Sequence, residues 1–249
     1  MFKTDNYKNK TVVITGGTKG IGLGITKAYL SLSAKVIILA RNKPKKQIQV
    51  KGNKALFYRC NVRDNANVEE VINEIFKVNK CIDVLINNAG GAPLISSLDA
   101  SMNFNNAIID LNLNSSFAVS YYVAKKMIKK SSGCVITNIS SVTATRPTPG
   151  SAAYGAAKGG LVNLTKTLAV EWAPRIRVNS IITGYIETEN SLLHYGSKKD
   201  MKAVAKTIPM KRMGTPEDIA NACIFLSSES SSWITGTAIE VHGGGESPA

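Results

Sequence analysis

Short apolar runs alternate with helix-like segments along almost the whole chain, and this alternation constrains the fold more than any other feature. Runs rich in β-branched residues occupy 11–15, 35–40, 55–60, 83–87, 134–140, 177–182 and 238–241. Several are apolar almost throughout, which is typical of strands covered by helices on both faces. Amphipathic helical patterns lie between the runs, for example at 68–76 and 217–228. The sequence therefore predicts an α/β fold with a doubly wound, seven-stranded parallel sheet.

Length and composition favour one domain over residues 1–249. The chain has 249 residues, of which 44% are hydrophobic, enough for a sizeable core. No internal repeat or linker divides it. The stretch at 185–213 has an ambiguous pattern, and we expect a partly helical flap there.

The chain is strongly basic. It has 31 Lys and Arg against 17 Asp and Glu, a net charge of +14, which suits nucleic acid, anionic lipid or phosphorylated small molecules. No helix-turn-helix signature, metal finger or alternating basic and aromatic stripe occurs, and aromatic residues make up only 6%. The sequence therefore predicts no nucleic-acid partner.

The cysteines are isolated, without a CxxC pair or a His at metal-ligand spacing, so we expect reduced thiols and no metal. They are Cys60, Cys81, Cys134 and Cys223. The first residues are polar, and no stretch approaches the ~20 apolar residues of a membrane span. We expect a cytoplasmic protein without a membrane partner.

A glycine-rich turn, TGGTKGIG at 15–22, stands where the first strand ends and a helix begins. Glycines there let the backbone approach a diphosphate, and the helix N-terminus offers unpaired N–H groups, as in the Rossmann fold. A tight turn without a ligand is the alternative interpretation. The candidate cofactor residues of this turn are Gly16, Thr18, Lys19, Gly20, Ile21 and Gly22.

The spacing of this turn is TGxxxGxG, NNAG follows the fourth run at Asn87–Gly90, and YxxxK stands at Tyr154–Lys158. With these three markers in this order, the chain resembles the short-chain dehydrogenase/reductase family over essentially its whole length. The resemblance implies cofactor contacts from Asn88, Ala89 and Gly90. It also implies a homotetramer formed through two long helices, here at about 112–130 and 153–172, with a dimer as the alternative.

The end of the second strand indicates the cofactor. An acidic residue there would bind the free 2′-hydroxyl of NAD, but this chain has Ala40 followed by Arg41, whose guanidinium suits a 2′-phosphate. Lys19 stands where NADP-preferring family members often carry a basic residue. We therefore expect NADP(H), bound by Arg41 and Lys19, whereas Lys43 and the lysines after it face solvent.

Three further cofactor contacts follow from the resemblance. The family usually has Asp near the end of the third strand to contact adenine, and this chain has Asn61, followed by Val62. The family motif PGxIxT appears as TGYIET, in which Thr183 replaces proline. Ile186 and Thr188 should meet the nicotinamide carboxamide, and we expect the loop to be less rigid without the proline.

Tyr154 and Lys158 are four positions apart, so a helix places them on one face. A nearby ammonium lowers the pKa of a phenol, which then exchanges protons with an alcohol or carbonyl oxygen. The resemblance implies that Ser141 orients that oxygen, with Ser140 as its neighbour. It also assigns Asn112 to a proton relay. Asn114 is the alternative.

These residues predict hydride transfer between NADP(H) and a carbonyl or secondary alcohol. The substrate should contact Gly91–Leu94, Val142, Thr143, Pro147–Gly150 and Tyr185–Tyr195, which are mostly small or apolar. We therefore expect a hydrophobic alcohol or ketone rather than a sugar or a charged acid.

Two alternatives remain. One is a 3-oxoacyl thioester reductase that docks an acyl carrier protein or coenzyme A on the basic run 125–130 with Arg175 and Arg177, although a solvated helix end explains that run as well. The other is a regulatory protein that binds NADP without catalysis.

Overall fold

The computed structural model describes residues 7–129 and 133–245, apart from the side chains of residues 193 and 194. Its main sheet has seven strands in the order β5-β2-β1-β6-β7-β8-β9, and every neighbouring pair is parallel. The prediction of a seven-stranded parallel sheet is confirmed. The strands are β1 Thr11–Thr15, β2 Lys35–Ala40, β5 Leu56–Arg59, β6 Val84–Asn87, β7 Cys134–Ser141, β8 Ile176–Thr183 and β9 Ala238–Val241.

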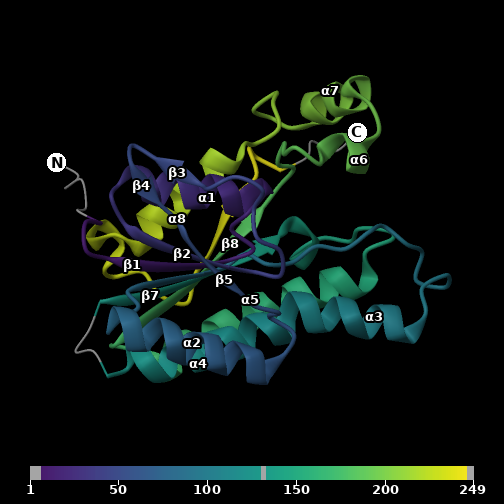
Figure 1. Ribbon diagram of the computed structural model, residues 1–249. Helices are drawn as coiled ribbons and strands as arrows, with labels where there is room; N and C mark the ends of the chain where they lie inside the picture. The colour runs from purple at the N-terminus through teal and green to yellow at the C-terminus, as the bar shows by residue number, and fades with distance from the viewer. Residues whose placement is uncertain (1–6, 130–132, 246–249) are drawn as a thin grey trace.

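Helices cover both faces of this sheet (Figure 1). On one face lie α1 (Gly20–Ser31) and α8 (Pro216–Ser227), and on the other α2 (Asn65–Asn79), α4 (Ser115–Met127) and α5 (Ala152–Trp172). Because side chains alternate along a strand, Val12 and Ile14 of β1 pack in the core with α1 and α8, and Val13 packs with α2 and α4. This two-sided burial explains why the strands are continuous apolar runs.

Two elements differ from the expectations. A short hairpin of β3 (Gln49–Val50) and β4 (Asn53–Lys54) turns through Lys51 and Gly52, whose φ angles of 49° and 83° fit a two-residue hairpin turn. The helix expected at about 112–130 begins ten residues earlier. It comprises α3 (Met102–Ile109), a π-helical turn at Asp110–Asn114, and then α4.

Four of the described α-helices, α2, α3, α7 (Lys198–Thr207) and α8, begin at a side chain that caps the first turn. Asp64 caps α2, Ser101 caps α3 and Thr215 caps α8, each by accepting a backbone N–H of the first turn. The start of α1 differs, because its N-cap residue Lys19 makes no such bond and the first turn holds no acidic residue.

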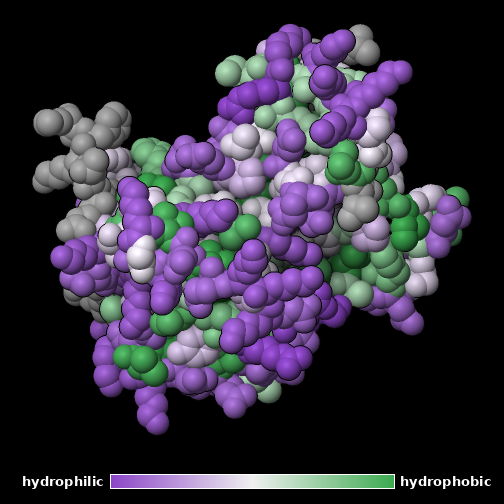
Figure 2. Space-filling view, turned by 45° about the horizontal axis from the view of Figure 1, so that its top comes forward, coloured by the Kyte–Doolittle hydropathy of each residue, from purple (hydrophilic) through white to green (hydrophobic). Residues whose placement is uncertain are grey.

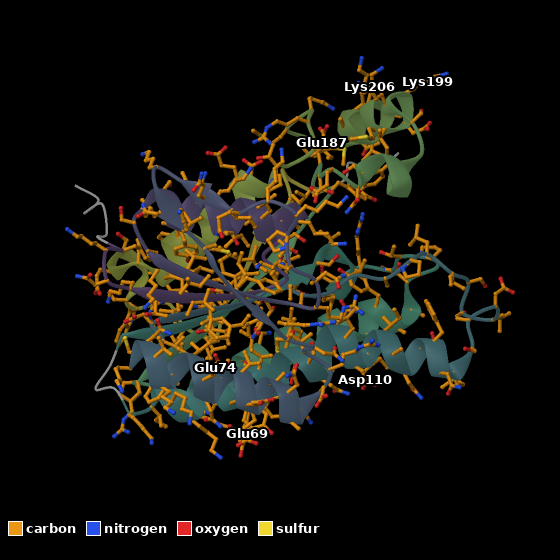
Figure 3. All side chains as sticks on the ribbon, viewed as in Figure 1. Glu69, Glu74, Asp110, Glu187, Lys199 and Lys206 are labelled. Carbon is orange, nitrogen blue, oxygen red and sulfur yellow. The ribbon has the colours of Figure 1, made fainter. Side chains whose placement is uncertain are left out.

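The segment 185–213 projects beyond the sheet (Figure 1). It contains α6 (Ser191–Tyr195) and α7 (Lys198–Thr207), and α7 packs through Met201 against Ile208 and Met213. Its outer surface is mostly hydrophilic (Figure 2). Lys199 and Lys206 extend from it into solvent (Figure 3).

Within residues 7–129 and 133–245, no helix is both long and apolar enough to cross a bilayer.

Candidate functional site

A cleft of about 550 Å³ runs along the ends of β1, β2, β6 and β7. The strand order reverses beside β1, because the chain passes from β1 to β2 and β5 on one side and then returns to β6 on the other. In parallel α/β sheets, ligands bind at this switch point. The predicted residues that line the cleft are Gly16, Thr18, Lys19, Gly20, Ile21, Gly22, Arg41, Asn61, Val62, Asn88, Ala89, Gly90, Tyr154, Lys158 and Thr188.

The glycine turn leaves no room for side chains. Gly16 has a φ of 69°, and a Cβ on Gly22 would lie 2.3 Å from the Gly16 carbonyl oxygen. Asn88 holds the turn by donating from Nδ2 to the carbonyl oxygens of Thr15 and Gly16, at 3.0 and 3.3 Å. Backbone N–H groups at the start of α1 therefore face the cleft, as a dinucleotide diphosphate requires.

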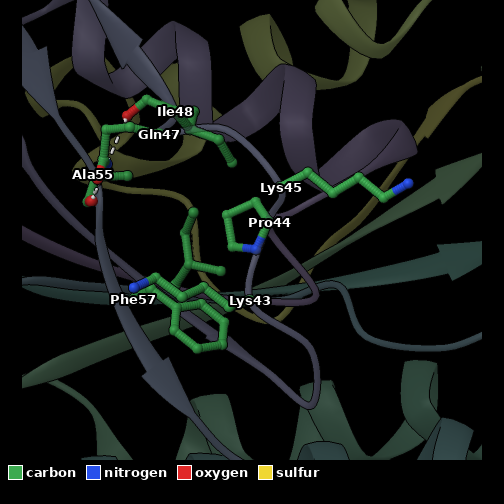
Figure 4. Close-up of a pocket in the computed structure, with 8 residues that line it drawn as sticks. Lys43, Pro44, Lys45, Gln47, Ile48, Ala55 and Phe57 are labelled. Carbon is green, nitrogen blue, oxygen red and sulfur yellow. Dashed lines mark hydrogen bonds between the residues drawn. The ribbon is translucent and has the colours of Figure 1, made fainter.

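Lys19 and Arg41 stand at the outer end of the cleft, and both are exposed. Arg63 lines the same end, and the sequence interpretation missed it, although its position two residues after Asn61 was a usable signal. Lys45 belongs to a separate small hollow, and its ammonium extends away from that hollow into solvent (Figure 4). The lysine that we expected to be solvated is therefore exposed.

Tyr154 and Lys158 line the inner end of the cleft, and Ser141 lies beside Tyr154. Lys158 is only 4% exposed, and its Nζ donates to the Ile139 carbonyl oxygen at 2.8 Å. Nζ also lies 5.7 Å from the centre of the Tyr154 ring, as expected from one turn of helix between them. Ser141 hydrogen-bonds to the Tyr154 hydroxyl. A phenol, a hydroxyl and an ammonium thus meet at the end of the cofactor cleft.

Burial decides how these groups titrate. It raises the pKa of Tyr154, and the hydrogen bond with Ser141 only partly opposes this. Burial also lowers the pKa of Lys158 to about 8. The expectation that the ammonium lowers the pKa of Tyr154 is therefore wrong. Removing the phenolate from water destabilises it more than the neighbouring groups stabilise it.

The structure gives different surroundings to Asn112 and its alternative Asn114, and to Ser141 and its neighbour Ser140. Asn112 is fully buried in the π-helical turn and binds Gly91 twice, accepting its N–H at 2.8 Å and donating to its carbonyl oxygen at 3.0 Å. Asn114 is exposed and donates instead to Asp110. Similarly, Ser140 donates to the Lys158 carbonyl oxygen. Ser140 supports the helix, whereas Ser141 adjoins the phenol.

A buried chain of amides behind the site was not predicted. Asn87 Nδ2 donates to Asn138 Oδ1 at 2.8 Å, and Asn138 Nδ2 donates to Thr165 Oγ1 at 2.9 Å. These bonds join β6, β7 and α5, which carry candidate cofactor and catalytic residues. The polar residues at apolar strand ends were the signal that could have revealed this support.

We expected the TGYIET segment to be less rigid because it lacks the proline, but its first residue is held by a hydrogen bond. Thr183 is the last residue of β8, is 6% exposed, and donates from Oγ1 to the Ser140 carbonyl oxygen at 3.0 Å. This bond anchors the position where the family has proline. The side chain of Ile186 packs in the core opposite Gly214 and does not line the cleft, so its contact with a carboxamide stays a prediction.

Of the expected substrate residues, only Val142 and Tyr185 line a second hollow of about 200 Å³, and its other walls include Arg146, Glu240 and His242. Arg146 lies against Tyr185, donating to its hydroxyl at 3.2 Å. His242 pairs with Glu240 at 2.7 Å. The side chain of His194 lies outside the described residues. In that described part, no group of three or more His, Cys, Asp or Glu residues is arranged to hold a metal.

Known proteins that resemble this chain are reductases and dehydrogenases. A family model described as "Enoyl-(Acyl carrier protein) reductase" matches residues 16–246. The chain is 37% identical over 242 residues to the 3-oxoacyl-[acyl-carrier-protein] reductase FabG of Chlamydia pneumoniae, covering 94% of this chain and 96% of that protein. It is 32% identical over 251 residues to dehydrogenase/reductase SDR family member 4 of Pongo abelii, covering 98% and 90%.

Solved structures agree with these relatives. Ligand-free aldohexose dehydrogenase of Thermoplasma acidophilum matches with a TM-score of 0.89 at 33% identity, covering 96% of this chain and 94% of that one. A short chain dehydrogenase of Bacillus anthracis matches with a TM-score of 0.85 at 34% identity, covering 96% and 97%.

Proposed function

Because the chain belongs to the short-chain dehydrogenase/reductase family, an oxidoreductase family acting on CH–OH and C=O groups, we propose that it is an NADP(H)-dependent carbonyl reductase or alcohol dehydrogenase. The observation that carries this proposal is the meeting of Tyr154 and Lys158 at the inner end of a cleft that begins at the glycine turn, with Ser141 beside the phenol. Residues 1–249 act as one catalytic domain, with 185–213 as its flap.

The chain's own groups handle the proton and the substrate oxygen. When bound, a nicotinamide cofactor supplies or accepts the hydride. Ser141 orients the carbonyl oxygen by a hydrogen bond. Tyr154, held protonated by its raised pKa, donates its phenol proton to that oxygen as negative charge develops. In the opposite direction, its phenolate removes the alcohol proton.

Lys158 and Asn112 complete the proposed catalytic set. The buried ammonium of Lys158, with its pKa lowered to about 8, gains and loses a proton near neutral pH and lies close to the phenol. It also reaches the part of the cleft assigned to the nicotinamide ribose. Asn112 holds Gly91 at the cleft wall, and we assign it to the proton relay between Lys158 and solvent.

The cations at the outer end support NADP(H) over NAD(H). Lys19 and Arg41 are exposed and free to turn toward a 2′-phosphate, and Ala40 offers no carboxylate to repel it. Asn61, Val62 and the Asn88–Gly90 wall provide the adenosine and nicotinamide contacts, with Thr188 near the carboxamide. We also assign Ile186 to the carboxamide, although its side chain packs in the core beside the cleft.

We favour a hydrophobic ketone or alcohol as substrate, because the expected pocket residues are small or apolar. Reduction of a 3-oxoacyl thioester is the second candidate, and the FabG relatives support it.

Part of the basic surface expected to dock such a thioester is engaged inside the protein, whereas Lys125, Lys129 and Arg175 are exposed. Arg177 donates to the carbonyl oxygens of Leu226 and Ile234 at 2.8 and 3.1 Å, and burial lowers its pKa. Arg175 donates to Ile128. These bonds hold the C-terminal ends of α4 and α8 in place, so the two arginines give little support to the docking interpretation. Lys130 lies outside the described residues.

We further propose a cytoplasmic homotetramer. Apolar residues are exposed on α4 and α5, including Phe117 at 45% and Val170 at 82%, and such residues favour burial between subunits. The four cysteines form no disulfide, which suits a reducing compartment. A nucleic-acid role finds no support in the sequence, which has no alternating basic and aromatic stripe.

The proposal is tested by following NADPH oxidation over a panel of ketones and 3-oxoacyl thioesters, paired with NADP⁺ reduction over alcohols. We expect turnover with at least one small apolar ketone. Turnover restricted to thioesters would select the second candidate. Cofactor binding without turnover on any substrate would support a regulatory protein instead, and a salt-dependent DNA titration tests for nucleic-acid binding.

A further inference from the structure

A carboxylate from the flap lies on the N-terminus of α1. The Gly20 N–H donates to Glu189 Oε1 at 2.8 Å, although the two residues are 169 positions apart in the chain. Thr188 lies beside this contact, its methyl group 3.6 Å from the position that a Cβ on Gly20 would take. The beginning of the flap is therefore fastened to the glycine turn.

This contact supplies what α1 lacks locally. The first turn of a helix has unpaired N–H groups and a partial positive charge, both of which favour a carboxylate. Asp64, Ser101 and Thr215 meet that need in α2, α3 and α8 from within their own segments. In α1 the neighbouring side chains provide no acceptor, and the acid comes from Glu189 instead.

The same N–H group belongs to the candidate cofactor cleft. Gly20 lines that cleft with Gly16 and Gly22, and Thr188 and Asn190 line it from the flap. A cofactor diphosphate on the glycine turn would need the N–H groups that begin α1. A carboxylate and a diphosphate cannot both accept from the Gly20 N–H in the same place, and both are negatively charged.

We propose that Glu189 is an internal competitor of the cofactor diphosphate. In the free protein its carboxylate holds the start of the flap against the glycine turn. The entering dinucleotide displaces it into solvent, where its exposed side chain has room. Cofactor binding thereby releases the flap from α1. This inference rests on the proposed function in one respect, that a dinucleotide binds to the glycine turn.

Equilibrium binding measures the competition directly, with the fluorescence of NADPH as the signal. Glu189→Ala removes the competing acceptor, and we expect the Kd for NADPH to fall about fivefold, since tenfold corresponds to 1.4 kcal/mol and the bond is exposed. Glu189→Gln keeps a hydrogen-bond acceptor without the charge, so its Kd for NADPH should lie between those of wild type and Glu189→Ala. Glu187→Gln is the matched control. It removes the same charge two positions away, where no side-chain hydrogen bond occurs among the described residues.

Adenosine 2′-monophosphate separates competition from general electrostatics, because it carries the 2′-phosphate but no diphosphate. Its Kd should be the same in wild type and Glu189→Ala. Hydrogen exchange gives a second readout. Amides of 188–195 should exchange faster in free Glu189→Ala than in free wild type, and the difference should vanish when NADPH is bound.

Three outcomes would overturn the inference while the proposed function stands: an unchanged Kd for NADPH in Glu189→Ala, equal tightening in Glu187→Gln, or parallel tightening of adenosine 2′-monophosphate. If wild type binds neither NADPH nor NADH, the proposed function fails, and the inference fails with it.

Discussion

The two ends of the cleft are built in different ways. At the inner end, Lys158 and Asn112 are buried and each is hydrogen-bonded to backbone groups of its own framework. At the outer end, Lys19 and Arg41 are exposed, and no hydrogen bond of their side chains occurs among the described residues. One end is fixed before any ligand arrives, and the other is arranged by the ligand.

The difference follows from what each end must do. Proton transfer requires donor and acceptor at hydrogen-bond distance, so its groups gain from a rigid setting that also shifts their pKa values. Recognition of a phosphate at the surface depends on charge and tolerates movement. The inner end should therefore lose its function after a change of one atom, whereas the outer end should change its preference without losing function.

Removal of one hydroxyl at the inner end should have the largest effect. In Tyr154→Phe the ring stays above Lys158, but no group donates the proton, and kcat should fall about 1,000-fold or more. Steady-state assays measure kcat, and equilibrium binding measures the Kd for NADPH separately. This Kd should change less than about twofold, since the phenol hydroxyl is not the cofactor's main contact. Tyr121→Phe on the exposed face of α4 is the control. Retained turnover would remove Tyr154 from its assigned role.

Exchange of charge at the outer end should alter preference. Ala40→Asp combined with Arg41→Ala places a carboxylate at the ribose and removes a guanidinium from the 2′-phosphate. We expect the ratio of kcat/KM for NADPH to that for NADH to fall about 100-fold, equal to about 2.7 kcal/mol. Lys45→Ala should leave the ratio unchanged, because that lysine points away into solvent. An unchanged ratio in the double variant would contradict the assignment of Arg41.

The sequence predicted the features that depend on local geometry and missed those that depend on packing. The strands were identified because two-sided burial makes them apolar, and the cleft residues because glycine and YxxxK spacings reflect local geometry. The start of the helix at Met102 was missed, since its Asn-rich sequence has low helix propensity and packing decides its conformation. The π-helical turn that directs Asn112 inward left no periodic signal either.

Long-range contacts and burial were beyond reach of the sequence. The bond from Gly20 to Glu189 joins residues 169 positions apart, and no local pattern marks it. The direction of the Tyr154 pKa shift was wrong because sequence spacing shows the neighbouring ammonium but not the loss of water around the phenol.

The cost of the buried ammonium gives a pH-dependent prediction. Lys158 has a pKa of about 8 in the folded protein against 10.5 for an ordinary lysine, so between these values the unfolded chain binds more protons and wild-type stability rises with pH. Lys158→Met lacks this group. We measure the stability of the variant minus that of wild type by urea unfolding. This difference should be about 2 kcal/mol higher at pH 7.5, where wild type bears the cost of the buried ammonium, than at pH 9.5. Equal differences at the two pH values would show that Lys158 titrates as in water.

The smallest effect concerns how the inner end is fixed. Thr183→Val keeps the side-chain shape but removes the hydroxyl that donates to the buried Ser140 carbonyl oxygen at 3.0 Å. The loss should lower the free energy of unfolding by about 1 kcal/mol. The melting temperature should fall by about 2–4 °C.

The matched control for this change is Thr145→Val, which loses an exposed hydroxyl bonded to the Val142 carbonyl oxygen at 3.2 Å. Water replaces that bond, so its effect should stay below about 0.5 kcal/mol. Equal effects of the two substitutions would mean that the hydroxyl at 183 does not anchor the strand from which Ser141 extends. A larger effect at 183 identifies framework hydrogen bonds as the reason that the inner end keeps its geometry without the proline common in the family.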